Sequence, residues 1–240
     1  SQVDAAIGGK TGVNSNHGKN LIGSFFQPKL VISDTSFLKS LKKKEIVCGY
    51  AEILKHAIIK DKSFFSWLRL NSKYIFLQEP KKLIYAIKKS CKIKLSFVNK
   101  DVNERKLRMI LNFGHTFAHA IEMATDKIVK KDYFRHGEAV GIGILCEIIL
   151  SNKNKDKDKV QLYKLASEIL KSYHLPIKIE LPNKISRRKV QNAIYKNIFL
   201  DKKRVSSNPR YIFLKKIGNP QIKEIDDLNS INEIIYSFLN

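Results

Sequence analysis

Apolar residues recur at three- and four-residue steps along most of the chain from about Lys42 onward. Ile46, Ala51, Leu54 and Ile58 show this spacing first, and it places them on one face of a helix. Similar spacing predicts further amphipathic helices over residues 62–77, 80–100, 107–125, 137–152, 159–173 and 186–197. We therefore expect a mainly α-helical domain over residues 42–240.

The first 41 residues follow a different pattern. Residues 4–23 hold five glycines among several Asn and Ser residues, a composition typical of loops. Pro28 then precedes a short run that contains β-branched residues, 29–34, and this run predicts a β-strand. Because the helical spacing begins only after it, we predict a domain boundary near Leu41, with domains over residues 1–41 and 42–240.

Two further segments break the helical pattern. Residues 152–159 form a run of Lys, Asp and Asn, which predicts a solvated loop between two helices. The apolar runs 210–214 and 221–225 flank Gly218 and Pro220, and this arrangement predicts a β-hairpin.

Composition narrows the class of protein. With 240 residues and 43% hydrophobic content, the chain can bury a large core. Its longest apolar stretch, 139–150, is too short to span a bilayer, so we expect no membrane partner. Three cysteines without a CxxC pair favour a cytoplasmic location. Because the chain begins with Ser and runs directly into a glycine-rich loop, we expect a fragment of a longer protein.

The formal charge of +23 raises the question of nucleic-acid binding. Only eight of the 45 basic residues are Arg, however, and they are scattered along the chain. We therefore expect no nucleic-acid partner. A positive field does favour phosphorylated and carboxylated small molecules.

One polar stripe carries candidate chemistry. Glu104, Arg108, Asn112, His115 and His119 follow each other by four, four, three and four residues, which predicts a single face of one helix. A stripe of satisfied polar residues without chemistry would give the same spacing. The two histidines are spaced as in the HExxH zinc motif, but Thr stands where that motif needs Glu, so a metalloprotease is disfavoured.

Other polar residues suggest a metal site and an anion site. Glu52 on a predicted helix and His136 at a helix start would complete, with one more histidine, the ligand set of an open catalytic zinc site. Spacing alone does not say which three residues meet. The adjacent glycines before Lys10 allow backbone amides to approach an anion, and Lys10 and Lys19 can supply charges to phosphate oxygens. A plain surface loop fits that composition equally well.

Five segments in order and register resemble the 3-dehydroquinate synthase family. They are VDAAIGGKTGVN at 3–14, GKNLIG at 18–23, GYAEILK at 49–55, LRMILNFGHTFAHAIE at 107–122 and HGEAV at 136–140. The resemblance extends from Val3 to about Tyr211 and lacks the family's main nucleotide-binding turn. It implies that residues 1–41 are the edge of a Rossmann-like α/β domain, followed by a mainly α-helical domain.

The resemblance also implies a role for individual residues. Metal ligands for Zn²⁺ or Co²⁺ would be Glu52, His115 and His136. Residues touching NAD would be Lys10, Lys19, Phe37, Leu38, Lys39 and Ser40. Residues around the substrate would be Asp4, Asn20, Lys55, Lys94, Arg108, Asn112 and His119. Glu104 and His119 would be candidates for proton transfer, and Arg210 would contact the substrate phosphate.

The activity implied by the resemblance is conversion of 3-deoxy-D-arabino-heptulosonate 7-phosphate to 3-dehydroquinate and phosphate, by a homodimer. Two alternatives stay open: another sugar-phosphate cyclase of the same superfamily, whose substrate lacks the carboxylate, and an inactive truncated remnant. The joint presence of Lys94, Arg108 and Asn112 favours a carboxylated substrate. We expect the 240 residues alone to be inactive.

Overall fold

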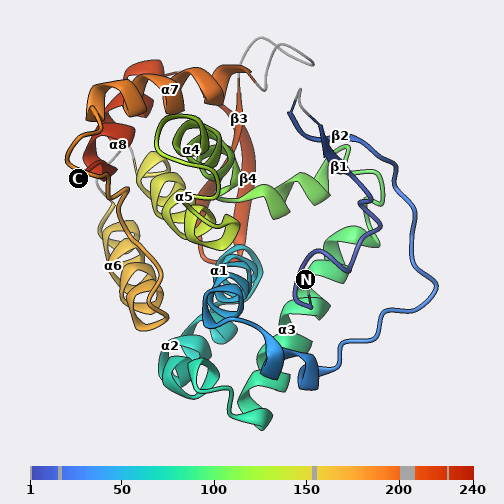
Figure 1. Ribbon diagram of the computed structural model, residues 1–240. Coiled ribbons are helices and arrows are strands. Elements are labelled where there is room, and N and C mark those ends of the chain that lie inside the picture. The colour runs from blue at the N-terminus through green and yellow to red at the C-terminus, as the bar shows by residue number, and fades with distance from the viewer. Residues whose placement is uncertain (1, 16–17, 153–155, 201–208, 226) are drawn as a thin grey trace.

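A computed structural model describes residues 2–15, 18–152, 156–200, 209–225 and 227–240. The order of its elements can be followed in Figure 1. They are β1 (Val13–Ser15), β2 (Gly18–Ile22), the 3₁₀ helix η1 (Thr35–Ser40), α1 (Lys43–Lys60), α2 (Lys62–Phe76), α3 (Pro80–Val98), the 3₁₀ helix η2 (Leu107–Asn112), α4 (His115–Ile128), α5 (His136–Leu150), α6 (Lys157–Ser172), α7 (Arg187–Leu200), β3 (Arg210–Lys216), β4 (Asn219–Glu224) and α8 (Leu228–Phe238).

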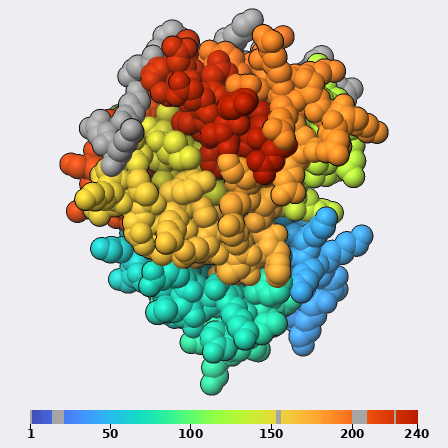
Figure 2. Space-filling view, turned by 90° about the vertical axis from the view of Figure 1, so that its left-hand side faces the viewer, coloured from blue at the N-terminus to red at the C-terminus, as the bar shows by residue number. Residues whose placement is uncertain are grey.

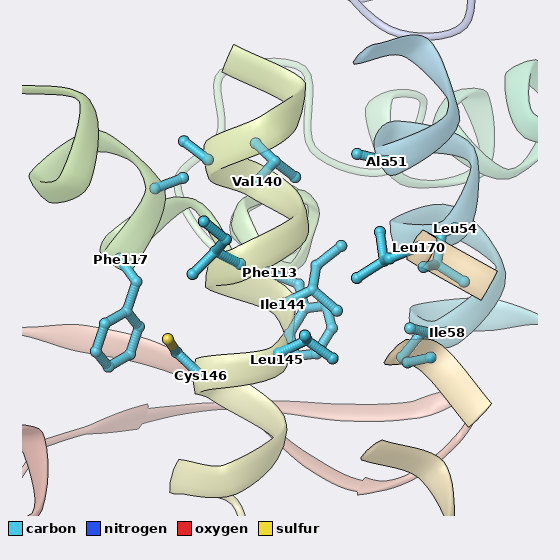
Figure 3. Packing of buried hydrophobic residues seen from close by; sticks show 14 of the residues in the cluster. Ala51, Leu54, Ile58, Phe113, Phe117, Val140, Ile144, Leu145, Cys146 and Leu170 are labelled. Atoms are coloured by element: carbon cyan, nitrogen blue, oxygen red, sulfur yellow. The ribbon is translucent and has the colours of Figure 1, made fainter. Parts of the chain in front are cut away.

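Helix α5 is the centre of the helical body. It contacts α1, α4, α6, α8 and β3, and nearly all of its side chains are buried. A helix that is apolar on every side is stable only when other elements surround it. Figure 3 shows Val140, Ile144 and Leu145 of α5 between Phe117 of α4 and Leu54 of α1. The helical character predicted after Lys42 is therefore confirmed.

Four helices have an acidic residue at the N-cap. Asp61, Glu79, Asp156 and Asp227 each accept hydrogen bonds from backbone amides in the first turn of α2, α3, α6 and α8, respectively. Such caps satisfy amides that have no partner within the helix. Figure 2 shows α8 and α6 together on one face of the body, with α2 below α6.

The prediction of one continuous helix over residues 107–125 is wrong. It is divided into η2 and α4, because Gly114 lies between them with φ of 83°. Glycine adopts this left-handed conformation without a steric penalty, and a β-carbon there would lie 2.9 Å from the backbone nitrogen of Ile144. Glu104 and Arg108 therefore do not share a helix with His115 and His119.

The strand predicted over residues 29–34 is also wrong. This segment has no regular structure, and Leu30 and Ile32 are 75% and 80% exposed. A strand needs a neighbouring strand to bind its backbone groups, and none lies beside this segment in the described part of the chain. The glycine-rich segment before it contains the short hairpin β1–β2. That residues 1–41 are the edge of a Rossmann-like domain stays a prediction.

The predicted hairpin near the C-terminus is confirmed as β3–β4, an antiparallel pair in which Ile212 faces Ile222. Its turn is fixed to the helical body because the Gly218 amide donates to the Ile58 carbonyl at 2.9 Å. Within the described residues, no helix has both the length and the hydropathy needed to cross a membrane.

Candidate metal and substrate site

Three polar side chains from three different helices meet at one point. Glu52 comes from the middle of α1, His115 is the first residue of α4 and His136 is the first residue of α5. The Oε1 atom of Glu52 lies 3.6 Å from Nε2 of His115 and 3.4 Å from Nε2 of His136. The fold thus brings together the three residues that were predicted as metal ligands.

Their separations fit one tetrahedral ion. Ligand atoms about 2.1 Å from a tetrahedral Zn²⁺ lie about 3.4 Å apart, and three ligand atoms of this group lie within 4.8 Å of one another. One carboxylate with two imidazoles is also the donor set of catalytic zinc sites that keep a position open for substrate. The residues therefore fit a divalent ion, and their role as ligands stays a prediction.

The local structure orients both imidazoles. Nδ1 of His115 lies 3.3 Å from the Phe113 carbonyl oxygen, which can only accept a hydrogen bond, so Nδ1 carries the proton. At the start of α5, the Glu138 carboxylate accepts a hydrogen bond of 2.8 Å from the Arg135 amide and fixes the first turn. Both Nε2 atoms then face Glu52.

The two histidines differ in their electrostatic surroundings. Burial lowers the pKa of His115 well below its usual value, and the positive charge of Lys55 lowers it further. Burial acts in the same direction on His136, but hydrogen bonds with Glu122 and Glu52 outweigh it and raise the pKa of His136 to about 10. The two carboxylates therefore favour the protonated form of His136, and a metal ion bound at Nε2 would have to displace that proton.

A second polar cluster adjoins the first. The ammonium group of Lys55 lies 2.5 Å from Glu52 Oε2 and 3.1 Å from Asp4 Oδ2, and Lys94 forms an ion pair with the other oxygen of Asp4. Burial opposes ionisation of Asp4, but both lysines hold its pKa well below the usual range. Burial lowers the pKa of Lys94 despite this pairing. Two lysine charges thus lie next to the candidate metal ligands.

Arg108 ties the glycine-rich segment to the helical body. Its buried guanidinium donates hydrogen bonds to the carbonyls of Gly8 at 2.7 Å and Val102 at 2.6 Å, and it lies over the Phe25 ring. The Asp101 carboxylate accepts from the backbone amide of Arg108 at 3.0 Å. Arg108 therefore has a structural partner on each side before any substrate binds.

The remaining residues of the predicted stripe, Glu104, Asn112 and His119, lie in two places. Glu104 forms an ion pair with Lys10 and accepts a hydrogen bond of 2.9 Å from the Asn112 amide. The ring of His119 lies 5.5 Å from that of His115 and 5.9 Å from that of His136, centre to centre. His119 thus lies beside the candidate metal ligands, while Glu104 joins the predicted substrate residue Asn112 to the predicted NAD residue Lys10.

The other predicted NAD residues lie elsewhere. Phe37, Leu38, Lys39 and Ser40 belong to η1, where Phe37 is 70% exposed and Leu38 packs against the core. The side chain of Lys19, also predicted to contact NAD, and that of Asn20, predicted to contact the substrate, lie outside the described residues. The predicted roles of all six residues stay predictions.

Two buried carboxylates near the site were missed by sequence analysis. Glu122 lies 3.4 Å from His136. Glu147 on α5 is fully buried, with Oε2 3.3 Å from the Ile212 amide. Burial raises the pKa of Glu147 to about 8, although hydrogen bonds from Gly114, Ile212 and Thr116 act against this shift. A glutamate within an apolar helix is the signal that could have identified Glu147.

Comparison with solved structures defines the class of fold. A 2-epi-5-epi-valiolone synthase from Streptomyces hygroscopicus, solved with NAD⁺ and Zn²⁺, matches 99% of this chain and 63% of its own with a TM-score of 0.80 at 23% identity. A 2-deoxy-scyllo-inosose synthase solved with carbaglucose-6-phosphate, NAD⁺ and Co²⁺ matches with a TM-score of 0.79 at 24% identity, over 99% of this chain and 64% of its own. The fold is that of these synthases.

Sequence comparison identifies the family. The model of the 3-dehydroquinate synthase C-terminal domain matches residues 49–204, and that of the N-terminal domain matches residues 1–48. A 3-dehydroquinate synthase of Pelagibacter ubique is 47% identical over 93% of this chain, and one of Nitratiruptor is 40% identical over 99%. The chain belongs to the 3-dehydroquinate synthase family. It spans 59% and 64% of the length of these two relatives.

Proposed function

We propose that the protein containing this chain is a 3-dehydroquinate synthase, a lyase of aromatic amino acid biosynthesis. It would convert 3-deoxy-D-arabino-heptulosonate 7-phosphate to 3-dehydroquinate and phosphate, with NAD and one divalent ion. The observation that carries the proposal is the convergence of Glu52, His115 and His136 beside two buried lysines in a chain of this family. The predicted homodimer and cytoplasmic location stay predictions.

The residues divide between two tasks. Glu52, His115 and His136 would hold Zn²⁺ or Co²⁺, which polarises a substrate oxygen when bound. Bound NAD would supply reversible hydride transfer. Lys55 and Lys94 would provide the ammonium groups that bind the anionic substrate in a buried site.

Two further groups would complete the proposed site. The Arg108 guanidinium has five N–H donors and uses two of them for backbone carbonyls. It would use its remaining donors to orient the substrate carboxylate. His119 would move a proton near the metal because its ring lies beside both candidate histidine ligands.

The test begins with metal binding by this chain. Equilibrium dialysis should give one Zn²⁺ or Co²⁺ per chain, and Co²⁺ should show the visible absorption of a tetrahedral site. His115→Ala should weaken binding by about 100-fold or more, because one of three ligands is lost. The matched control is His174→Ala, since His174 is exposed and packs against Phe76 away from the cluster. Equal metal binding by both variants would contradict the site.

The second test addresses the reaction. The protein as its gene encodes it should release phosphate from 3-deoxy-D-arabino-heptulosonate 7-phosphate when NAD and the metal are supplied. We expect kcat/KM to be about 10- to 100-fold lower with sedoheptulose 7-phosphate or glucose 6-phosphate, because the charged hydrogen bonds to a carboxylate are then lost. A preference for one of these sugar phosphates would instead identify a different cyclase.

A further inference from the structure

The imidazole of His136 lies between two carboxylates. Its Nε2 atom is 3.4 Å from Oε1 of Glu52, which is a candidate metal ligand, and its Nδ1 atom is 3.4 Å from Oε1 of Glu122. Glu122 is buried, with 4% of its surface exposed, whereas the His136 side chain is 47% exposed. An exposed imidazole at a helix start needs a fixed neighbour to hold one ring orientation.

The two candidate histidine ligands are arranged in the same way. His115 directs Nδ1 toward the Phe113 carbonyl at 3.3 Å and Nε2 toward Glu52. His136 directs Nδ1 toward Glu122 and Nε2 toward Glu52. When Glu52 binds a metal ion, the acceptor that remains for each ring lies at Nδ1. The one N–H of a neutral imidazole is then placed there, so the lone pair of Nε2 is left for the ion.

We propose that Glu122 is a positioning residue, which orients His136 and selects the tautomer that binds the metal through Nε2. The inference rests on the proposed metal site and assigns to it a residue outside the three ligands. One helix, α4, then supplies a ligand and the group that orients the other histidine.

The position of Glu122 in α4 supports this role. It lies seven residues after His115 in α4, or about two turns along the same helix face. A hollow of about 280 Å³ beside His136 includes Glu122 and Asp126 in its wall. Solvent from this hollow would compete for Nδ1 if Glu122 were replaced. The hollow also offers a matched control, because Asp126 is a carboxylate on the same helix and in the same wall.

The experiment measures the dissociation constant for Zn²⁺ by competition with a chromophoric chelator. Glu122→Gln should weaken binding about 10- to 100-fold, because the amide loses the charge and can present either a donor or an acceptor to Nδ1. Glu122→Asp should give a similar loss, since the shorter side chain does not reach His136. Asp126→Asn should change the constant by less than about twofold. Circular dichroism of each metal-free variant checks that it folds.

A second measurement does not depend on any variant. Nitrogen NMR of the Zn²⁺-loaded chain should show His136 bound through Nε2, with the hydrogen on Nδ1. Binding through Nδ1 would overturn the inference, as would equal Zn²⁺ affinities for Glu122→Gln and the unchanged chain. If the unchanged chain binds no Zn²⁺, the proposed metal site itself fails.

Discussion

The candidate metal ligands and residues 23–41 lie in opposite kinds of surroundings. The ligands are on α1, α4 and α5, and all three helices pack together around one buried core. Residues 23–41 instead expose large apolar side chains, including Phe26, Leu30, Ile32 and Phe37. The ligands are therefore held by packed helices, whereas these four side chains stay mainly exposed in the described part of the chain, although Leu38 packs against the core.

The largest effect on stability should come from a buried carboxyl group in the helical body, that of Glu147. Burial raises the pKa of Glu147 from a usual value of 4.5 to about 8. Between these pH values the unfolded chain loses the proton and the folded chain keeps it, so stability is present at low pH and falls as the pH rises toward 8. Glu147→Gln, which mimics the neutral acid, should not show this loss.

Urea unfolding of both chains between pH 4.5 and 8.5 would measure the difference. We expect similar free energies of unfolding near pH 4.5. Near pH 8 the Glu147→Gln variant should be more stable by about 3–5 kcal/mol, which corresponds to the shift in pKa. Taking the difference between the chains removes the contribution of other titrating groups. If the two stability curves run parallel, Glu147 does not remain protonated in the folded protein.

The periodicity of apolar residues predicted most helices because their buried residues repeat regularly. At Gly114, however, the left-handed backbone conformation divides the helix that periodicity predicted. Helix α8 was missed although Ile231, Ile235 and Phe238 follow the helical spacing and are buried. The strand predicted at residues 29–34 failed for a different reason. β-propensity describes side chains that fit a sheet surface, and the segment has no strand beside it.

The site was predictable only in part. Spacing identified candidate residues, yet the three proposed ligands come from separate helices, so only the family resemblance could group them. Neither spacing nor resemblance gave Glu122 a role, although it ends the segment 107–122, because that role depends on a contact with His136 across two helices. Buried carboxylates become visible as functional candidates once burial and distance are known.

An intermediate effect should come from the contact between the glycine-rich segment and the helical body. Gly8 has φ of 99°, and a β-carbon there would lie 2.4 Å from Nη2 of Arg108. Gly8→Ala should therefore displace the guanidinium that holds the glycine-rich segment and lower the free energy of unfolding by about 1–3 kcal/mol. Thermal and urea unfolding would measure this loss.

Gly49→Ala is the matched control for this prediction. Gly49 lies inside α1, and its added β-carbon would come no closer than 4.0 Å to Val3. Alanine favours a helix interior over glycine, so this variant should be neutral or slightly stabilised. Equal destabilisation by both variants would show that Arg108 is not what makes Gly8 sensitive.

The smallest effect should come from residues 23–41 themselves. Ile32 is 80% exposed and lies in a segment without regular structure, so Ile32→Ser removes little buried surface and should change stability by less than about 0.5 kcal/mol. Ile58→Ser provides the contrast, because Ile58 is fully buried in α1 and its loss should cost about 3 kcal/mol or more. Denaturant titration of both variants measures the two costs. A loss above about 1 kcal/mol for Ile32→Ser would mean that the segment packs its apolar side chains in solution. The contrast between the two regions would then be one of degree.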